Sequence, residues 1–420
     1  MIGGPEYPDG YNLPAAEAIK RVVDVPVMVV GRFLDPEFAE QALRDERADM
    51  IVMGRPLLAD PQLPNKLAAG QFDQIRRCIS CQNCIDSMFL WPRDARMTCA
   101  VNPATGREQT LNYSPAATQK HVVVVGAGPG GMEAARVAAE RGHRVTLLDR
   151  RRRLGGSLLL ASTVHSDNER LLDYLKQEMR RLPIDLRLGV DATRERIAAL
   201  APDEVIVATG ARLQYAPLPG MDRANVITGN QLRELVAGEP TRPAKALPLL
   251  VRAGVALFGP LIDRYLTPDR LRRAANTWLP FGRRVAIIGG DLAAIEVAEF
   301  LARRGREVVV LEAGEVIAPE IGPKRRLEHE KRMEKLRISI NVRAKVSEIS
   351  ERGVVLALDG GGKREVAADT VLRAGEPVAS TSLYDELQAA GVKSHLIGDA
   401  SGLGLIVKAT YEGHSIANKL

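Results

Sequence analysis

The 420-residue sequence predicts an α/β protein in which helices cover parallel sheets. Three observations lead to this fold class. Two apolar strands, near residues 122 and 284, are each followed by a glycine-rich turn and a helix; all four cysteines fall between residues 78 and 99; and two shorter strand–helix units precede them. A chain of this length usually divides into two or three domains, each with its own core.

Composition excludes several classes of protein. Hydrophobic residues make up 45% and charged residues 26%, as in ordinary globular proteins. The net charge of +6 could favour an anionic ligand, but no helix-turn-helix, zinc-finger or RNP-type pattern indicates nucleic acid. The first residues lack the basic and apolar regions of a signal peptide, and no apolar run could span a membrane without charge or proline. The expected location is the cytoplasm.

Residues 1–77 form two strand–helix units, in which each strand ends in a Gly-Arg pair. The helices and strands are expected over residues 14–22, 25–30, 36–45 and 48–53. Their nearly continuous apolar strands are typical of a parallel sheet covered on both faces. Backbone amides and a guanidinium at Gly31-Arg32 and Gly54-Arg55 can meet a phosphate. Simple strand termination is the alternative explanation.

The four cysteines form the most specific motif. Cys78, Cys81 and Cys84 lie within seven residues, and Cys99 follows after fourteen more. Because each iron of a 4Fe–4S cluster takes one thiolate, this spacing favours a cluster. Structural zinc is the alternative, although zinc usually takes two CxxC pairs held well apart. Disulfides would need an oxidising compartment, which nothing in the sequence indicates.

The first glycine-rich turn predicts a dinucleotide site. Gly126 permits a tight turn, Gly128 lets the backbone approach a pyrophosphate, and Gly131 admits close helix packing. The pyrophosphate then meets the positive end of the helix. The next strand ends at Asp149, 23 residues after the first glycine, where a carboxylate can accept both ribose hydroxyls. We therefore assign Asp149 and Arg150 to the site.

The second glycine-rich turn repeats this design with two changes. Gly289 and Gly290 follow the strand, but Asp291 and Ala294 replace the second and third glycines of the motif. Glu312, again 23 residues after the first glycine, would accept a ribose 2′-hydroxyl and repel a 2′-phosphate, which favours NADH. The Asp291 carboxylate would repel a pyrophosphate unless it turns away or meets an arginine. The alternative is a Rossmann fold kept for structure, with a weakened nucleotide site.

Residues 229–282 separate the Thr-Gly strand of the first fold from the second turn and differ from both. Residues 246–262 are apolar but hold two prolines and an arginine, and residues 269–273 are basic and helical. We expect a helical pair packed on the rest of the chain or on a partner. Contact with a membrane surface is the alternative.

These motifs resemble one family of flavoenzymes. The segments 26–33, 49–61 and 77–81 are similar to 2,4-dienoyl-CoA reductase, trimethylamine dehydrogenase and 2-enoate reductase. Those enzymes join an FMN barrel of the old-yellow-enzyme type to a 4Fe–4S segment and a disulfide-reductase-like module. The resemblance runs from about residue 10 to residue 420. It implies a (β/α)₈-barrel remnant (1–77), a cluster segment (78–117), an FAD domain (118–228 and 384–420), a helical insertion (229–282) and an NAD(P)H domain (283–383).

The resemblance also implies site residues. Segments 153–157, 204–211 and 395–400 are similar to the family's FAD motifs, with Asp399 on the ribityl chain. They add Gly156, Thr209, Gly210, Gly398 and Asp399 to the FAD site. By the same resemblance the FMN phosphate would be held by Gly31, Arg32, Gly54 and Arg55. The implied cofactors are FAD, a 4Fe–4S cluster and NADH, with FMN where its barrel is complete.

The implied function is an oxidoreductase that passes electrons between NADH, FAD, the cluster and FMN to reduce an enoate or enoyl-CoA-type alkene. In amine-oxidising members the flow is reversed. A barrel of this type takes about 250 residues, so most of it, with the substrate pocket, is missing here. A partner chain or a homo-oligomer would supply the rest. The alternatives are an electron-input reductase subunit (a diaphorase half) serving a separate barrel protein, and an inactive truncated fragment.

Overall fold

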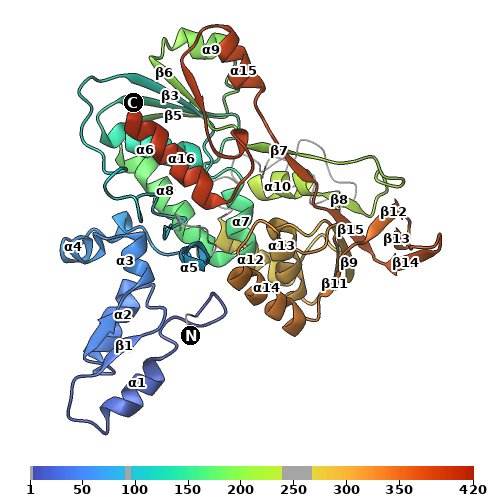
Figure 1. Cartoon of the computed structure of the whole chain (residues 1–420), viewed down its shortest axis with the longest axis horizontal. Coiled ribbons are helices and arrows are strands. Elements are labelled where there is room, and N and C mark those ends of the chain that lie inside the picture. Colours follow the sequence, from blue (N-terminus) through green and yellow to red (C-terminus); the bar gives the residue numbers. More distant parts are fainter. Residues whose placement is uncertain (1–2, 90–95, 239–266) are drawn as a thin grey trace.

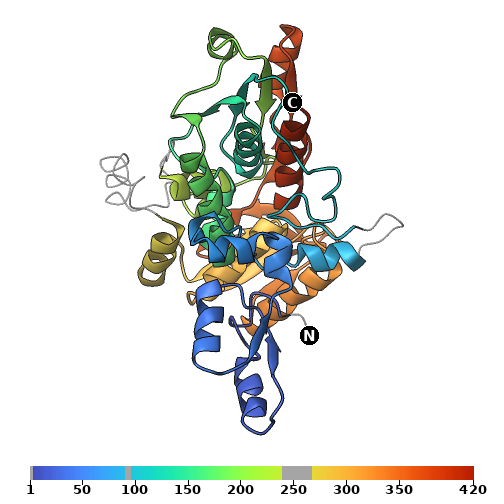
Figure 2. The same ribbon diagram turned by 90° about the vertical axis from the view of Figure 1, so that its left-hand side faces the viewer.

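The computed structural model describes residues 3–89, 96–238 and 267–420. The chain forms a small N-terminal segment, a cysteine-containing segment and two α/β units (Figure 1). Figures 1 and 2 both show the N-terminal segment projecting at one end of the molecule, with the C-terminus near the other end. The predicted apolar run 246–262 lies outside the described residues.

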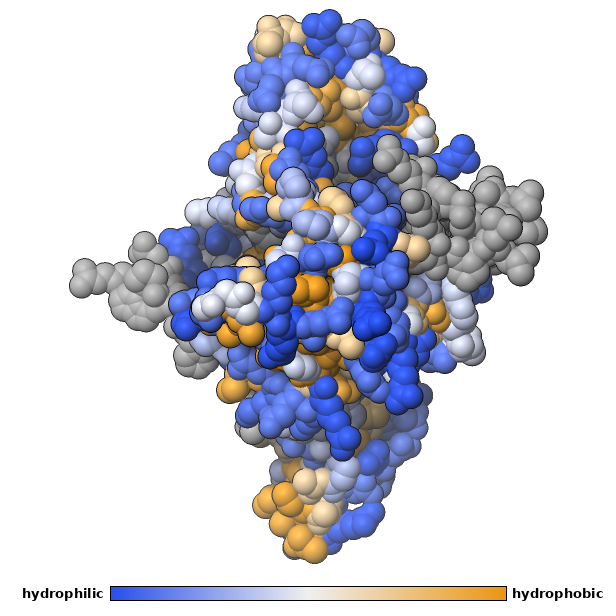
Figure 3. All heavy atoms as spheres, turned by 90° about the vertical axis from the view of Figure 1, so that its right-hand side faces the viewer, coloured by the Kyte–Doolittle hydropathy of each residue, from blue (hydrophilic) through white to orange (hydrophobic). Residues whose placement is uncertain are grey.

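The N-terminal segment follows the predicted order of elements. It contains α1 (Leu13–Lys20), β1 (Met28–Val30), α2 (Pro36–Arg44) and β2 (Met50–Val52). The two strands are parallel, with Met28 opposite Met50. Val29 is buried, whereas Met28 is 64% and Val30 56% exposed. Helices therefore cover one face only, and the other leaves apolar side chains at the surface (Figure 3). The sheet was expected to be covered on both faces, but helices cover only one of them, because two strands cannot close a barrel.

Short helices lead from this segment to the cysteines. They are α3 (Arg55–Ala59), α4 (Leu63–Ala68), η1 (Phe72–Gln74) and α5 (Asn83–Phe89). Prolines in the first turns of α3 and α4 suit helix starts, where no intrahelical N–H bond is lost.

The first α/β unit is built on a parallel sheet of order β17-β6-β3-β4-β5. Its strands are β3 (His121–Val125), β4 (Arg144–Asp149), β5 (Ile184–Leu188), β6 (Glu204–Val207) and β17 (Ser394–Leu396). Its helices are α6 (Pro129–Glu140), α7 (Leu158–Val164), η2 (Ser166–Asn168), α8 (Glu169–Arg181), α9 (Arg194–Ala199), α15 (Ser382–Ala389), η3 (Gly398–Ala400) and α16 (Ile406–Lys419). Because side chains alternate along a strand, Val122 and Val124 face α6 and α8, and Val123 and Val125 face α9 and α15.

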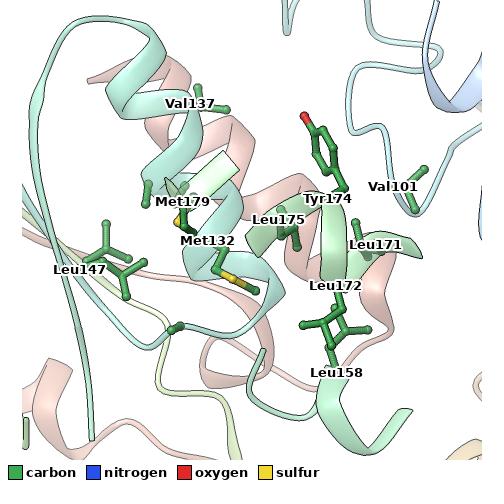
Figure 4. Packing of buried hydrophobic residues seen from close by; sticks show 14 of the residues in the cluster. Val101, Met132, Val137, Leu147, Leu158, Leu171, Leu172, Tyr174, Leu175 and Met179 are labelled. Atoms are coloured by element: carbon green, nitrogen blue, oxygen red, sulfur yellow. The ribbon is translucent and has the colours of Figure 1, made fainter. Parts of the chain in front are cut away.

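The core of this unit is closely packed. Met132 of α6, Leu147 of β4, and Leu171 and Leu175 of α8 belong to one cluster of buried side chains (Figure 4). Val101 from the cysteine segment joins the same cluster. The cysteine segment and the first nucleotide fold therefore share one hydrophobic core.

The second α/β unit has a parallel sheet of order β11-β10-β9-β15-β8. Its strands are β8 (Val226–Thr228), β9 (Arg284–Ile288), β10 (Glu307–Leu311), β11 (Ser339–Asn341) and β15 (Thr370–Arg373), and its helices include α10 (Gly229–Ala237), α12 (Pro268–Thr277), α13 (Leu292–Ala302) and α14 (Pro323–Lys335). One face packs on α13 and α14, and the other on an antiparallel sheet. That sheet consists of β12 (Lys345–Ile349), β13 (Gly353–Ala357) and β14 (Lys363–Ala367).

Two antiparallel strands, β7 (Ala211–Gln214) and β16 (Glu376–Ala379), connect the units. The chain leaves the first unit through β7 and returns through β16, so the second unit is inserted into the first. Every helix in the described parts of the chain is too short or too polar to cross a membrane.

Candidate cofactor sites

A cavity of about 590 Å³ lies at the carboxyl ends of the first sheet. It brings together residues that are far apart in the sequence but share a predicted role. All ten residues assigned to the FAD site line it: Gly126, Gly128, Gly131, Asp149, Arg150, Gly156, Thr209, Gly210, Gly398 and Asp399. The carboxyl edge of a parallel sheet is where such folds bind nucleotides.

The glycine turn leaves the start of α6 open to this cavity. Gly128 is the N-cap residue, and no side chain in the described residues caps the helix there. Gly131 lets helix and strand approach closely, since a Cβ there would lie 1.8 Å from the Gly126 carbonyl oxygen. Unpaired first-turn amides and the helix dipole form an anion site. This arrangement fits a pyrophosphate.

Two carboxylates that line the cavity also accept hydrogen bonds from backbone amides around it. Asp149 accepts hydrogen bonds from the amides of Ala127 at 2.6 Å and Arg151 at 2.7 Å, which ties the end of β4 to the glycine turn. Asp399 accepts from the Gly404 amide at 3.1 Å. Burial raises the pKa of both carboxyls. Their positions suit hydroxyl groups of a ribose and a ribityl chain.

The start of α13 in the second fold is arranged differently. Asp291 is the N-cap residue and accepts from the Ala294 amide at 2.8 Å, and Glu320 accepts from the Leu292 amide at 2.5 Å. Glu312 accepts from Gly314 at 2.6 Å. The Asp291 carboxylate therefore caps α13 and keeps its charge at the helix start, where a pyrophosphate would approach. Two amides that could bind a pyrophosphate already carry carboxylate partners.

Arg233, which was not predicted from the sequence as a site residue, lies between the two folds. Arg233 of α10 lines the first cavity, and the charges of Asp291 and Asp399 act on it. Burial lowers its pKa, and Arg151 lowers it further. The sequence signal was a capping box, in which Thr228 and Gln231 bond reciprocally at the helix start. That pattern predicts a helix, but not what its residues face.

The four cysteines line one small cavity. All are free thiols, and burial raises the pKa of Cys78 and Cys99 to about 12. Among the described residues, no three Cys, His, Asp or Glu side chains lie close enough to share a single metal ion. Zinc needs four ligands at about 2.3 Å from one point, whereas a cubane holds its thiolates around a larger body. Four thiols around one cavity are the donor set that a 4Fe–4S cluster takes.

Several polar groups around this cavity have no hydrogen-bond partner in the part of the chain that the structure describes. The buried atoms Arg55 Nη1, Ser80 Oγ, and Gln82 Nε2 and Oε1 have no hydrogen bond in the described structure. Ser80 and Gln82 have φ values of +50° and +60°, so the loop curls around the thiols, and the Ser80 amide donates to Cys78 Sγ at 3.4 Å. Unpaired donors facing thiols suit the sulfides of a cluster, whose properties depend on such hydrogen bonds.

The two Gly-Arg pairs have different surroundings. The buried Arg32 guanidinium bonds Asp9 at 2.8 Å and Asp167 at 2.9 Å, which ties the N-terminal segment to the first unit. Burial would lower the pKa of Arg32, but Asp167 and Asp9 raise it. Arg55 instead lines the cysteine cavity. The FMN phosphate site at Gly31, Arg32, Gly54 and Arg55 stays a prediction.

The chain matches two protein families in sequence. Residues 120–397 match the family described as pyridine nucleotide-disulphide oxidoreductase. Residues 7–74 match the NADH:flavin oxidoreductase / NADH oxidase family. The second match covers the two strand–helix units that precede the cysteines.

Three relatives extend over almost the whole chain. NADH oxidase of Thermoanaerobacter brockii is 34% identical over 99% of this chain and 59% of its own. Cinnamate reductase of Clostridium sporogenes is 31% identical over 98% of this chain and 56% of its own. The structure of a 2-naphthoyl-CoA reductase with 2-naphthoyl-CoA superposes with a TM-score of 0.83 at 30% identity, covering 100% of this chain and 58% of that one.

The chain thus spans less than two thirds of the length of these relatives. The predicted family and fold class, a dinucleotide-binding α/β module joined to part of an FMN-type barrel, are confirmed. The chain belongs to the pyridine nucleotide-disulphide oxidoreductase family, joined to a partial segment of the NADH:flavin oxidoreductase family.

Proposed function

We propose that this chain is the electron-input part of a flavin and iron–sulfur reductase that takes electrons from NADH. FAD would occupy the first cavity, NADH would approach from the second fold, and Cys78, Cys81, Cys84 and Cys99 would hold a 4Fe–4S cluster. FAD supplies hydride acceptance and single-electron release, and the cluster supplies one-electron transfer. The residues of this chain would hold these groups at fixed distances in a core that excludes water.

One observation carries this proposal: helix α16 contacts both cavities with adjacent residues. Ala409 lines the first cavity, and the Thr410 hydroxyl donates to the carbonyl of Ala100 at 2.9 Å, while Ala100 lines the cysteine cavity. Arg170 of α8 also donates to the Cys78 carbonyl at 3.2 Å. The two cofactors would therefore sit in one packed body, and electrons could pass between them without a domain movement.

The acceptor side would lie in a barrel of which this chain holds two strands. The exposed Met28 and Val30 of β1 lie on the sheet face that a closed barrel would bury, so they fit completion by further strand–helix units, from the same polypeptide, a partner chain or a second copy. FMN would bind there, with the backbone amides of the two Gly-Arg pairs at its phosphate. The names of the relatives favour an unsaturated acid or CoA thioester as the small-molecule substrate. Four thiols fit a reducing, cytoplasmic compartment.

A second candidate is a diaphorase half that serves a separate barrel protein. The exposed strands favour it as well, and an artificial one-electron dye would replace the barrel in an assay. In this case the chain alone oxidises NADH with the dye but does not reduce an enoate. Addition of the barrel protein would then restore alkene reduction.

The test is an anaerobic purification followed by counts of flavin and metal per chain. We expect one FAD and about four irons, as a 4Fe–4S site implies, and loss of the iron in Cys81→Ser with FAD retained. Ser339→Ala is the matched control, because Ser339 is an exposed residue of β11, the edge strand of the second sheet. Zinc in place of iron, or unchanged iron in Cys81→Ser, would contradict the proposal.

A further inference from the structure

The cysteine cavity is lined by an arginine, Arg55, that has no carboxylate partner among the described residues. Arg55 is the first residue of α3, and its side chain lines the cavity together with all four thiols. Its Nη1 atom is buried and unbonded, and no carboxylate in the described residues pairs with it. A half-buried guanidinium in this state is unfavourable, because a buried charge needs a partner. The surroundings therefore favour an anion in the cavity.

The other arginines near the cysteines already have partners. Arg325, whose charge reaches Cys81, pairs with Glu296 at 3.0 Å. Arg77, next to Cys78, lies 3.7 Å from Asp35. The positive charge of Arg55 acts on Cys78, Cys81 and Cys84. Among these arginines, Arg55 is the one whose charge is left for the contents of the cavity.

We propose that Arg55 is the charge partner of the cluster and raises its reduction potential, an inference that rests on the cluster assignment made above. One electron added to a thiolate-bound cluster makes it one charge more negative, with no bond formed and no proton moved. A nearby fixed cation stabilises the reduced state more than the oxidised state, because attraction grows with charge in a low-dielectric site. Arg55 is a positioning residue that tunes the cluster and does not bind it.

The neighbouring polar groups support this role. Gln82 Nε2 and Ser80 Oγ are buried donors without partners on the loop that carries the thiols. Donors of this kind also raise the potential by hydrogen bonding to sulfur. The guanidinium would add a full charge to these dipoles, and its loss should therefore give a larger shift than the loss of either donor.

The experiment is a redox titration of the whole chain, purified anaerobically and followed by the electron paramagnetic resonance signal of the reduced cluster. Arg55→Gln removes the charge, Arg55→Lys keeps it, and Arg77→Gln removes a charge that is already paired. Iron and flavin are counted in every sample. We expect about four irons in each protein. At the wild-type midpoint, the ratio of reduced to oxidised cluster should fall at least tenfold in Arg55→Gln, about 59 mV for one electron.

Arg55→Lys should titrate close to the wild type, and Arg77→Gln should be indistinguishable from it. An unchanged midpoint in Arg55→Gln with its iron retained would overturn the inference. If Arg55→Gln loses iron, Arg55→Lys becomes the deciding variant. It must retain the cluster with a midpoint potential near that of the wild type, and a midpoint lower by about 59 mV in that variant would also overturn the inference. Absence of iron from the wild type would refute the proposed function instead.

Discussion

The two nucleotide folds of this protein share a sequence pattern but differ in what occupies the start of their helix. In the first, Gly128 leaves the amides of α6 open to a cavity. In the second, Asp291 and Glu320 already accept hydrogen bonds from the amides of α13. The spacing of a glycine motif therefore predicts a strand–turn–helix unit. Whether its anion site is free depends on side chains that the motif does not specify.

A second difference lies one turn further along the helices. Glu133 of α6 and Glu296 of α13 occupy the same place in the two motifs, and both are buried. Burial would raise the pKa of Glu133, but Arg136 and Arg76 outweigh it and hold that pKa below its usual range. Burial raises the pKa of Glu296 to about 7. The charge of Arg325 lowers this pKa in part, and the charge of Glu299 raises it. The pKa values of these two equivalent glutamates are thus shifted in opposite directions.

The largest effect is expected where the first fold is most tightly packed. In Gly131→Ala the new Cβ would lie 1.8 Å from the Gly126 oxygen, so helix and strand must separate. We expect a loss of about 3 kcal/mol or more in unfolding free energy, with loss of FAD. The matched change in the second fold, Ala294→Gly, should cost only about 1 kcal/mol. Denaturant unfolding measures the loss of unfolding free energy in both variants, and equal losses would contradict the expected difference between the two folds.

The next effect separates folding from binding. Gly128 has φ −75°, and no protein atom lies within 4 Å of a Cβ built there. Gly128→Ala should therefore keep its stability but place a methyl group where the pyrophosphate approaches. We expect FAD affinity to fall about a hundredfold, or about 2.8 kcal/mol, measured by flavin fluorescence during reconstitution. Full FAD occupancy in this variant would show that the ligand does not approach α6.

A smaller effect tests the second fold. Asp291→Asn keeps a good N-cap residue but removes the charge. We expect the KM for NADH to fall about fivefold, near 1 kcal/mol, with FAD content unchanged. Asp291→Ala is the control for the cap itself and should lose about 1 kcal/mol of stability. A KM for Asp291→Asn at or above that of the wild type would show that this carboxylate does not oppose NADH.

The last effect lies in the dependence of folding stability on pH. Because the folded pKa of Glu296 lies above its unfolded value of 4.5, its protonation contributes stability at low pH that is lost as pH rises towards 7. Glu296→Gln should remove this loss, which is on the order of 3 kcal/mol at most. The depressed pKa of Glu133 acts oppositely, and its stabilisation is lost as pH falls. Melting temperatures between pH 5 and 8 measure this, and a constant difference between wild type and Glu296→Gln would contradict it.

Much of the fold could be predicted because its signals are local. The glycine turns, the strand that ends at Asp149, the strand that ends just before Glu312, and the strand–helix units before the cysteines depend on residues close in sequence. The partners could not be predicted, because they come from distant elements. Glu320 reaches Leu292 from 28 residues away, and Asp167 reaches Arg32 from 135. For the same reason Arg55, assigned to a phosphate by its motif, is found beside the thiols.

The central claim is that the open first fold holds FAD and that NADH reaches it despite the carboxylates of the second. The most direct measurement is an anaerobic titration of the purified chain with NADH, following flavin absorbance. We predict that one FAD per chain is bleached by NADH, and that bleaching needs less NADH in Asp291→Asn. A bound FAD that dithionite bleaches but excess NADH leaves oxidised would contradict the claim, and would show that the second fold is kept for structure alone.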